Sequence, residues 1–349
     1  MAARTAIGLD IGTSVVRAVE LSYGRAGITL DRFGQVVLPE GAVVDGQVVE
    51  PGPVADCIRQ LWTATGLSHK RVVLGVANNK VIVRRIELPS MEPAELRRSL
   101  PFQVADILPM DVEQSVLDFY PLEEHLRPDG AVLSGLLVAA SRETVLANVT
   151  CVEQAGLTVQ AVDLTSFAVL RALGKQTGPD IESEALIDVG ARVTNIVVHR
   201  GGVPVFVRIL PMGGQEVTDA VAGSLGVGHA QAEALKQQIG HASPSTETEE
   251  LLRTINGRVQ DFVDEIMGSL DYFAASQPGS RVQRILVSGG GSRLGGLVER
   301  LARDTRLPVL AGDPMANLRL GKTGLDEMQL EFVRPLAAVP VGLALGAFG

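Results

Sequence analysis

The chain has 349 residues, more than one hydrophobic core usually fills, so two domains are expected. Hydrophobic residues make up 46% and charged residues 20%, a balance typical of a folded protein with a large core. Only 4% of residues are aromatic, and the net charge is −9 without a cluster of Lys and Arg. The composition therefore argues against a nucleic-acid-binding protein.

Cysteine usage and the apolar segments restrict the class further. Cys57 and Cys151 are too few for a disulfide framework or a zinc cluster, which favours a reducing, cytoplasmic environment. The N-terminus runs directly into a strand-like segment, without the apolar region of a signal peptide. The longest apolar stretch, residues 336–349, is too short to span a bilayer. We expect a protein that does not insert into a membrane but could reach one through a partner.

The first 78 residues predict the beginning of an α/β domain. Residues 6–10, 15–21 and 27–38 have strand-like composition and are separated by turns that contain glycine. Residues 54–65 carry apolar side chains at helical spacing, and residues 72–77 form a β-branched run typical of a buried strand.

The following block has a different character and predicts an inserted α+β subdomain. It combines strand-like segments with a charged amphipathic helix, which we expect to be interrupted near Pro101, and a second helix. The predicted segments are strands at residues 81–88, 115–122 and 132–140, and helices at residues 92–108 and 142–155.

After this block the chain repeats its opening. Three strands follow one another again, with an Asp-x-Gly turn between the first two, which predicts two related halves. Glycine, proline and polar residues at 174–183 predict the connection between the halves. The predicted segments are strands at residues 158–164, 185–189, 194–200, 203–210 and 284–288, helices at 166–173, from 215 and from 295, and a polar helical block at 228–276 broken near 240–244.

The first Asp-x-Gly turn has the residues of a phosphate-binding hairpin. An apolar strand ends at Asp10, and Gly12 allows backbone N–H groups to approach an anion closely. Thr13 and Ser14 add hydroxyl donors, while Asp10 is placed to hold a hydrated magnesium ion. Alone, the same residues fit an ordinary surface turn equally well.

The second turn repeats this arrangement with Asp188, Gly190 and Thr194. Two such hairpins, one in each half, could face each other across a cleft and hold a polyphosphate from both sides. Two carboxylates would repel the phosphates unless a cation intervened, so Mg²⁺ is implied. The coincidence of two turns favours phosphate binding over two unrelated surface turns.

A glycine-rich loop follows a later apolar strand. Gly289, Gly290 and Gly291 precede Ser292 at a point where a strand leads into a helix. Such loops let a flat ligand or a phosphate lie close to the backbone, and in α/β proteins ligands bind at the carboxyl ends of strands. A glycine-rich loop by itself is weak evidence.

Together, these motifs resemble the phosphate-1, phosphate-2 and adenosine motifs of the actin, sugar-kinase and chaperone superfamily. Within it, the opening Gly8-Leu9-Asp10-Ile11-Gly12-Thr13-Ser14-Val15-Val16-Arg17-Ala18-Val19-Glu20-Leu21 is similar to that of the PilM family of type IV pilus assembly proteins, which is related to the cell-division protein FtsA. The resemblance covers nearly the whole chain. It implies an α/β, actin-like (ribonuclease-H-like) two-domain fold with an FtsA-type inserted subdomain.

The implied domains follow the segments above. They are a first actin-like domain at 1–78 with 156–180 and 330–349, an inserted α+β subdomain at 79–155, a second actin-like domain at 181–227 and 280–329, and its helical subdomain at 228–279.

The resemblance also implies an ATP site with Mg²⁺. Asp10 and Asp188 would hold the metal through water. The residues expected to line the phosphates are Gly12, Thr13, Ser14, Arg17, Gly190 and Thr194, and those expected around ribose and adenine are Gly213, Gly214, Glu233, Lys236, Gly289, Gly290, Gly291 and Ser292. Glu233 and Lys236 alone would fit a charge pair on a solvated helix face equally well.

Thr165 departs from the family, whose members usually carry a glutamate at this place. A carboxylate there can orient an attacking water molecule, whereas threonine cannot act as that base. The change leaves ATP binding intact and implies slow or absent ATP hydrolysis.

By resemblance, the chain is expected to be a cytoplasmic, ATP-binding adaptor at the inner face of the plasma membrane. Relatives bind the short cytoplasmic tail of the membrane protein PilN, in a groove between the inserted subdomain and the first domain, and connect it to other pilus assembly components. ATP would act mainly by fixing the angle between the two domains. Self-association into a homo-oligomer stays open.

Two alternatives stay open as well. A sugar or small-acid kinase of the same superfamily would keep both Asp-x-Gly hairpins but would need an additional Asp base. An FtsA-like, filament-forming protein would usually carry a C-terminal amphipathic membrane helix, whereas residues 336–349 have no basic face.

Overall fold

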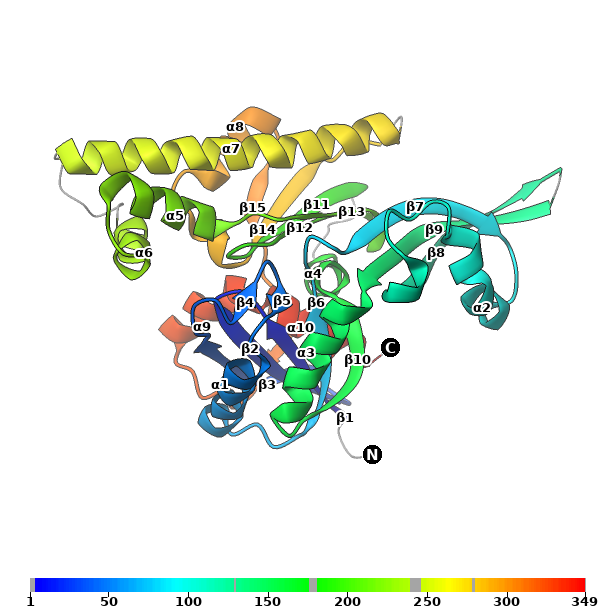
Figure 1. Cartoon of the computed structure of the whole chain (residues 1–349), viewed down its shortest axis with the longest axis horizontal. Coiled ribbons are helices and arrows are strands. Elements are labelled where there is room, and N and C mark those ends of the chain that lie inside the picture. The colour runs from blue at the N-terminus through cyan, green and yellow to red at the C-terminus, as the bar shows by residue number, and fades with distance from the viewer. Residues whose placement is uncertain (1–3, 129, 176–180, 239–245, 278–279, 349) are drawn as a thin grey trace.

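The structure, a computed structural model, describes residues 4–128, 130–175, 181–238, 246–277 and 280–348. Figure 1 shows two lobes that each contain a β-sheet, an arm that projects to one side, and a long helix that lies across the outer face of the second lobe. The predicted break near 240–244 and the middle of the predicted connection at 174–183 lie outside the described residues.

The first lobe contains a six-stranded sheet with helices on its outer face. Its elements are β1 (Arg4–Ile11), β2 (Val15–Gly24), β3 (Gly27–Val37), β6 (Arg71–Val76), β10 (Thr158–Leu164), β16 (Arg319–Leu320), α1 (Pro51–Thr65) and α3 (Arg142–Gln154). The strand order is β10-β6-β1-β2-β3-β16, and β1 is antiparallel to β2 but parallel to β6. Leu9, Ile58 and Cys151 join the sheet, α1 and α3 in one core.

The second lobe repeats this topology. Its elements are β11 (Ser183–Val189), β12 (Thr194–Arg200), β13 (Val203–Leu210), β14 (Arg284–Ser288), β15 (Val309–Ala311), α5 (Gly214–Leu225), α6 (His229–Gln238), α7 (Thr246–Ser276) and α8 (Leu297–Thr305). The order is β13-β12-β11-β14-β15, with β11 antiparallel to β12 and parallel to β14. Because β1 has the same relation to β2 and β6, the predicted repeat of two related halves is confirmed.

Two helices fill the space between the sheets. They are α4 (Thr165–Leu173) and α10 (Ala338–Gly346), and their side chains share one core with residues of both lobes, such as Leu21 and Leu186. Every residue from Ala338 to Ala344 is buried. The longer run Glu327–Gly346 meets the length and composition of a membrane span, but half of it is buried in the structure, as in a core helix.

The arm is a three-stranded sheet with one helix on it. Its elements are β7 (Ile82–Pro89), β8 (Ser115–Arg127), β9 (Gly130–Ser141) and α2 (Pro93–Val104), with the strand order β7-β9-β8. The expected interruption at Pro101 is wrong, because α2 continues to Val104. Leu100 and Val104 are buried against the arm's sheet, and this packing holds the helix on both sides of the proline.

Helix α3 leads from the arm back into the first lobe. Its residues fall within the inserted subdomain predicted at 79–155, but Cys151 and Val152 lie in the core of the first lobe. The division of the chain into domains stays a prediction. Short elements that the sequence analysis did not predict are β4 (Val43–Val44), β5 (Gln47–Val48), β15, β16, α9 (Glu327–Val333) and 3₁₀ turns at Val112–Gln114, Gly290–Arg293 and Arg334–Ala337.

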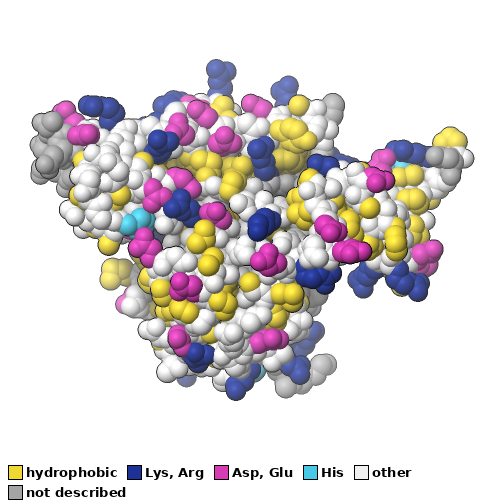
Figure 2. Space-filling view, in the orientation of Figure 1, with side chains coloured by type: hydrophobic (Ala, Val, Ile, Leu, Met, Phe, Trp, Pro, Cys, Tyr) yellow, Lys and Arg dark blue, Asp and Glu magenta, His cyan; other side chains and the backbone are white. Residues whose placement is uncertain are grey.

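The surface agrees with the composition. Figure 2 shows acidic and basic side chains interspersed over the face in view, without a field of one sign. Hydrophobic side chains are visible on the arm, where Phe102 and Leu126 are 84% and 90% exposed.

Close packing of α10 against α4 generates a first prediction. A Cβ atom on Gly342 would lie 1.8 Å from the Ala168 carbonyl oxygen, so Gly342→Ala must push the two helices apart. We expect a loss of stability on the order of 1–3 kcal/mol, measured as a lower thermal midpoint. The matched control is Gly268→Ala in α7, where no atom lies within 4 Å of the added Cβ. It should gain up to about 1 kcal/mol from helix propensity. An unchanged midpoint for Gly342→Ala would contradict the close packing of the two helices.

Candidate functional site

The two Asp-x-Gly hairpins have the same geometry. In the first, Asp10 lies opposite Arg17 in the β1–β2 register, and the Gly12 N–H donates to the Val15 carbonyl at 3.1 Å. In the second, Asp188 lies opposite Asn195 in the β11–β12 register. There the Gly190 N–H donates to the Val193 carbonyl at 3.0 Å. Each hairpin therefore ends a buried strand with a carboxylate and turns directly after it.

The start of α5 joins the second hairpin to the rest of the site. The Gly214 N–H donates to the Gly190 carbonyl at 3.0 Å, and Gln215 N–H donates to the Ala191 carbonyl at 2.8 Å. A Cβ on Gly214 would lie 3.7 Å from Lys236 Nζ and 3.9 Å from the Gly291 Cα. Elements that are far apart in the sequence thus converge on one place.

The glycine loop presses against the strand of the second hairpin. Gly289 has a φ of +82°, and a Cβ there would lie 2.3 Å from the Val189 carbonyl oxygen. A Cβ on Gly291 would lie 2.3 Å from the Val189 side chain. The Ser292 hydroxyl donates back to the Gly289 carbonyl at 2.7 Å. Only glycine fits this approach, which explains two of the three consecutive glycines.

The two carboxylates are desolvated and feel each other's charge. Burial raises the pKa of Asp10 to about 6, an effect that Arg17 opposes and Asp188 reinforces. Arg17 Nη1 lies 3.8 Å from Asp10 Oδ2. Burial also raises the pKa of Asp188, and a hydrogen bond from Ser288 at 2.7 Å works against it. Two buried carboxylates with one nearby guanidinium keep a net negative charge when both are ionised, which favours the binding of a further cation.

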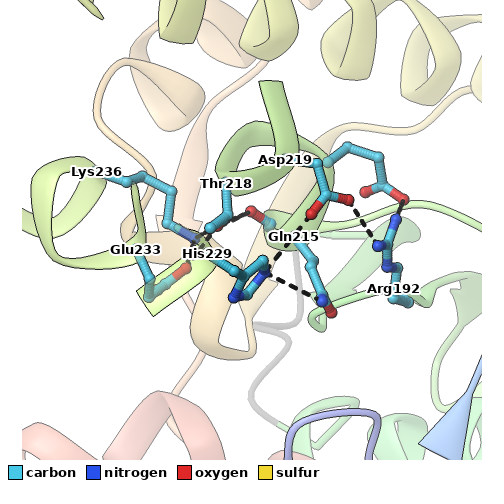
Figure 3. A network of polar contacts seen from close by, with 9 residues as sticks. Arg192, Gln215, Thr218, Asp219, His229, Glu233 and Lys236 are labelled. Atoms are coloured by element: carbon cyan, nitrogen blue, oxygen red, sulfur yellow. Dashed lines mark hydrogen bonds and ion pairs between the residues drawn. The ribbon is translucent and has the colours of Figure 1, made fainter. Parts of the chain in front are cut away.

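A polar network surrounds Lys236 (Figure 3). Lys236 Nζ donates to Glu233 Oε2 at 2.7 Å, to the Thr218 hydroxyl at 2.8 Å and to the Gly214 carbonyl at 3.0 Å. Burial opposes the ionisation of Glu233, but hydrogen bonds from Lys236, Thr218 and Gln237 outweigh it and lower its pKa. The Lys236 side chain is only 12% exposed. The pair is therefore held against α5 and is not a charge pair on a solvated face.

The same view shows a second group of contacts at the start of α5 (Figure 3). Arg192 donates to Asp219 at 2.6 Å, and His229 lies 3.6 Å from the same carboxylate. Gln215 contacts His229 at 3.3 Å. These contacts tie the second hairpin to α5 and α6.

Some expected site residues are already engaged elsewhere. Thr194 is fully buried, and its hydroxyl donates to the Met212 carbonyl at 2.9 Å, so it does not point into open space. Thr13 and Ser14 lie in the first hairpin and are half-buried. Gly213 precedes α5, where its N–H donates to Glu216. The individual site assignments stay predictions.

Sequence reasoning missed two residues at the site. Asn195 contacts Asp188 and α4, and its signal was its position seven residues after the aspartate, as Arg17 is after Asp10. Arg293 lies 4.1 Å above the Phe332 ring and donates to the Phe332 carbonyl. Burial lowers the pKa of Arg293, and so does the positive charge of Arg17. Arg293 is therefore a second cation near the first hairpin. No sequence pattern indicated this proximity.

These residues fit a magnesium-bound nucleotide. Glycine positions keep side chains out of the place where the hairpin, α5 and the loop converge. Carboxylate oxygens are the ligands that Mg²⁺ prefers, usually with water completing its coordination. Among the described residues no group of three or more His, Cys, Asp or Glu could hold a metal ion. Two carboxylates with few protein partners would suit a hydrated ion that is also held by a phosphate.

Comparisons with known proteins agree with this geometry. The family model of the type IV pilus assembly protein PilM matches residues 8–348. A chain of the solved PilM–PilN type IV pilus biogenesis complex is 27% identical, with a TM-score of 0.86 and coverage of 99% of this chain and 98% of that chain.

More distant proteins share the fold. The cell division protein FtsA of Bacillus subtilis (strain 168) is 24% identical over 261 residues, which are 68% of this chain and 58% of FtsA, so the chain spans less than two thirds of that relative. MreB 5 of Spiroplasma citri bound to AMPPNP has a TM-score of 0.51 at 14% identity. The match covers 98% of this chain and 95% of the MreB 5 chain, and at this identity it is evidence for the fold alone. The expected actin-like two-domain fold of the FtsA branch is confirmed. The chain belongs to the family of the type IV pilus assembly protein PilM.

Proposed function

We propose that this chain is an ATP-binding, actin-like adaptor of type IV pilus assembly that docks the cytoplasmic tail of a PilN-like membrane protein. The observation that supports the nucleotide most strongly is the convergence of Gly190, Gly214, Lys236 and Gly291. The protein would work in the cytoplasm, and binding to the PilN-like partner would hold it at the inner face of the plasma membrane. The pilus assembly family favours this function over a sugar kinase or an FtsA-like filament.

The chain's own groups divide the work of binding. Asp10 and Asp188 would hold Mg²⁺ through water, and Arg17 would compensate part of their charge. The metal supplies the positive charge that allows phosphates to approach two carboxylates. Glu233 and Lys236 form a fixed polar pair beside Gly214, where they would contact ribose or base.

Efficient hydrolysis is not expected. Thr165 is buried, and its hydroxyl donates to Asn195 Oδ1 at 3.0 Å, so it offers no carboxylate to take a proton from water. Nucleotide would then act mainly as a ligand whose binding energy sets the relation between the two lobes.

The junction of the arm and the first lobe is a suitable place for a peptide. Arg142 at the start of α3 donates to the Ser115 carbonyl at 3.2 Å, which ties α3 to the start of β8. Val116 on β8, Leu146 on α3 and Val162 on β10 are 42%, 55% and 40% exposed. Because β8 is an edge strand, an extended tail could add to it while apolar side chains contact this surface.

The first test of the proposal is a change of stability with nucleotide and pH. Nucleotide-free protein should gain about 2.7 kcal/mol with ATP and Mg²⁺ at one hundred times the dissociation constant. Asp10→Asn should lose the magnesium-dependent part of this gain. Without nucleotide it should instead be more stable than wild type at pH 8, because it removes a buried charge.

The sign follows from the direction of the shift. The folded-state pKa of Asp10, about 6, lies above its ordinary value of 3.8, so its contribution to stability is present at low pH and lost as the pH rises through 6. The gain from Asp10→Asn at pH 8 is therefore at most about 3 kcal/mol and shrinks below pH 6. Thermal midpoints measure both effects, with the exposed Asp106→Asn as control. A wild-type midpoint that does not respond to ATP and Mg²⁺ would remove the nucleotide from the proposal.

The second test concerns turnover. Wild-type ATP hydrolysis should be far below the roughly 10 s⁻¹ of an ordinary enzyme. Thr165→Glu should accelerate it, because a carboxylate can orient water. Phosphate release under single-turnover conditions measures the rate, with Thr165→Gln as a control of the same size as glutamate that adds no base. Brisk wild-type turnover would show that Thr165 is not at the water-orienting position.

The third test concerns the partner. A fluorescent peptide of the cytoplasmic tail from the cognate PilN-like protein should bind, with a different affinity when Mg²⁺ and ATP are present. A coupling of about 1–3 kcal/mol is typical, which corresponds to roughly 5–150-fold in affinity. Asp10→Asn should remove the difference between the two conditions. Identical affinities in wild type would leave an adaptor without a nucleotide switch, and no binding would exclude the PilN-like partner.

A further inference from the structure

Asn195 occupies a special position in the second hairpin. It lies directly opposite Asp188 in the β11–β12 register, where the first hairpin places Arg17 opposite Asp10. The second half therefore has a neutral amide at the position where the first half has Arg17. The Asn195 side chain is almost completely inaccessible, at 4% exposure of the residue. A polar group at this depth must have its hydrogen bonds satisfied within the protein.

The hydrogen bonds of Asn195 reach into both lobes. Its Oδ1 accepts from the Thr165 hydroxyl at 3.0 Å and from the Ser166 hydroxyl at 2.7 Å. Its side chain also faces Asp188 across the β11–β12 register, and this interaction lowers the pKa of that carboxyl. When Asp188 is ionised it only accepts, which favours the NH₂ group of Asn195 on its side. The oxygen is then left to face the two hydroxyls.

The two hydroxyls belong to the first turn of α4. This helix follows β10 directly, and β10 is part of the first lobe's sheet, while Asn195 and Asp188 are in the second lobe. Thr165 and Ser166 are themselves buried. A continuous buried chain of hydrogen bonds therefore runs from the helix between the lobes to one of the two carboxylates of the nucleotide site.

We propose that Asn195 is a positioning residue that couples the engagement of Asp188 by Mg²⁺ and nucleotide to the seating of α4, and thereby to the angle between the two lobes. The inference rests on the proposed nucleotide site. A ligand that binds the Asp188 carboxylate changes the interaction between that carboxylate and the Asn195 amide. The oxygen of the same amide accepts the hydrogen bonds from α4. Because one planar amide faces Asp188 on one side and accepts from both hydroxyls on the other, a reorientation of Asp188 is transmitted to the start of α4.

A double variant separates coupling from binding. Thr165→Val with Ser166→Ala removes both donors to Asn195 Oδ1 and leaves the bond between Asn195 and Asp188 in place. Ser166→Ala alone is a milder version that retains one donor. The matched control is Ser269→Ala in α7, which also deletes a fully buried hydroxyl, one that bonds only the Glu265 carbonyl of its own helix.

The readout is the distance between the lobes. Gln60→Cys on α1 and Glu250→Cys on α7 place spin labels at exposed positions of the two lobes. The native thiols should label poorly, because both are buried, and burial raises the pKa of Cys57 and raises that of Cys151 to about 12. Binding isotherms and pulsed-EPR distance distributions are recorded without ligand and with saturating Mg²⁺ and AMPPNP.

In the labelled parent and in Ser269→Ala, we expect Mg²⁺–AMPPNP to shift the distance distribution. In the double variant we expect saturable binding with less than half of that shift, and in Ser166→Ala an intermediate shift. A full shift in the double variant, or binding without any shift in the parent, would overturn the role of Asn195 alone. Absence of binding in the parent would refute the proposed nucleotide site, and this inference with it.

Discussion

The burial of two carboxylates at the ends of equivalent strands is the constraint on which the rest of the site depends. Asp10 and Asp188 are each delivered by a central strand, and desolvation makes both costly to ionise. Single protein groups relieve this cost only in part: Arg17 near Asp10, and Ser288 and Asn195 at Asp188. A site that retains an uncompensated buried charge is prepared for a cationic ligand, and its stability without that ligand must come from elsewhere.

That stability comes from the layer between the two sheets. Helices α4 and α10 are packed from both sides, and Gly342 allows their backbones to approach each other closely. The core of this layer contains residues of both lobes, such as Leu21 and Leu186. The proposed change of angle between the lobes would have to take place about this layer, with Asp10 and Asp188 each moving with the sheet of its own lobe.

The repeat, the hairpins and the glycine loop could be predicted because each leaves a local signature. An apolar strand followed by Asp-x-Gly is readable in the sequence, and so is a run of three glycines. Contacts between distant segments leave no such signature. Arg17 and Arg293 belong to different lobes, so the effect of Arg17 on the pKa of Arg293 depends on how the lobes pack. Thr194 bonds Met212 because of a strand register that its own motif does not encode. Likewise, Pro101 was misread because packing around it outweighs its local preference.

Thr165 and Asn195 are matched as hydrogen-bond donor and acceptor. A carboxylate at position 165 would face Asn195 Oδ1, and two acceptors cannot bond each other. Asn195 would then have to turn its NH₂ group toward residue 165 and present its oxygen to Asp188, where a metal-binding carboxylate again offers no donor. Thr165 avoids this conflict, because its hydroxyl donates to the oxygen that Asp188 leaves free. A carboxylate introduced at position 165 would therefore have to displace these hydrogen bonds before it could orient water, whereas the wild-type network suits a nucleotide used for conformation more than for turnover.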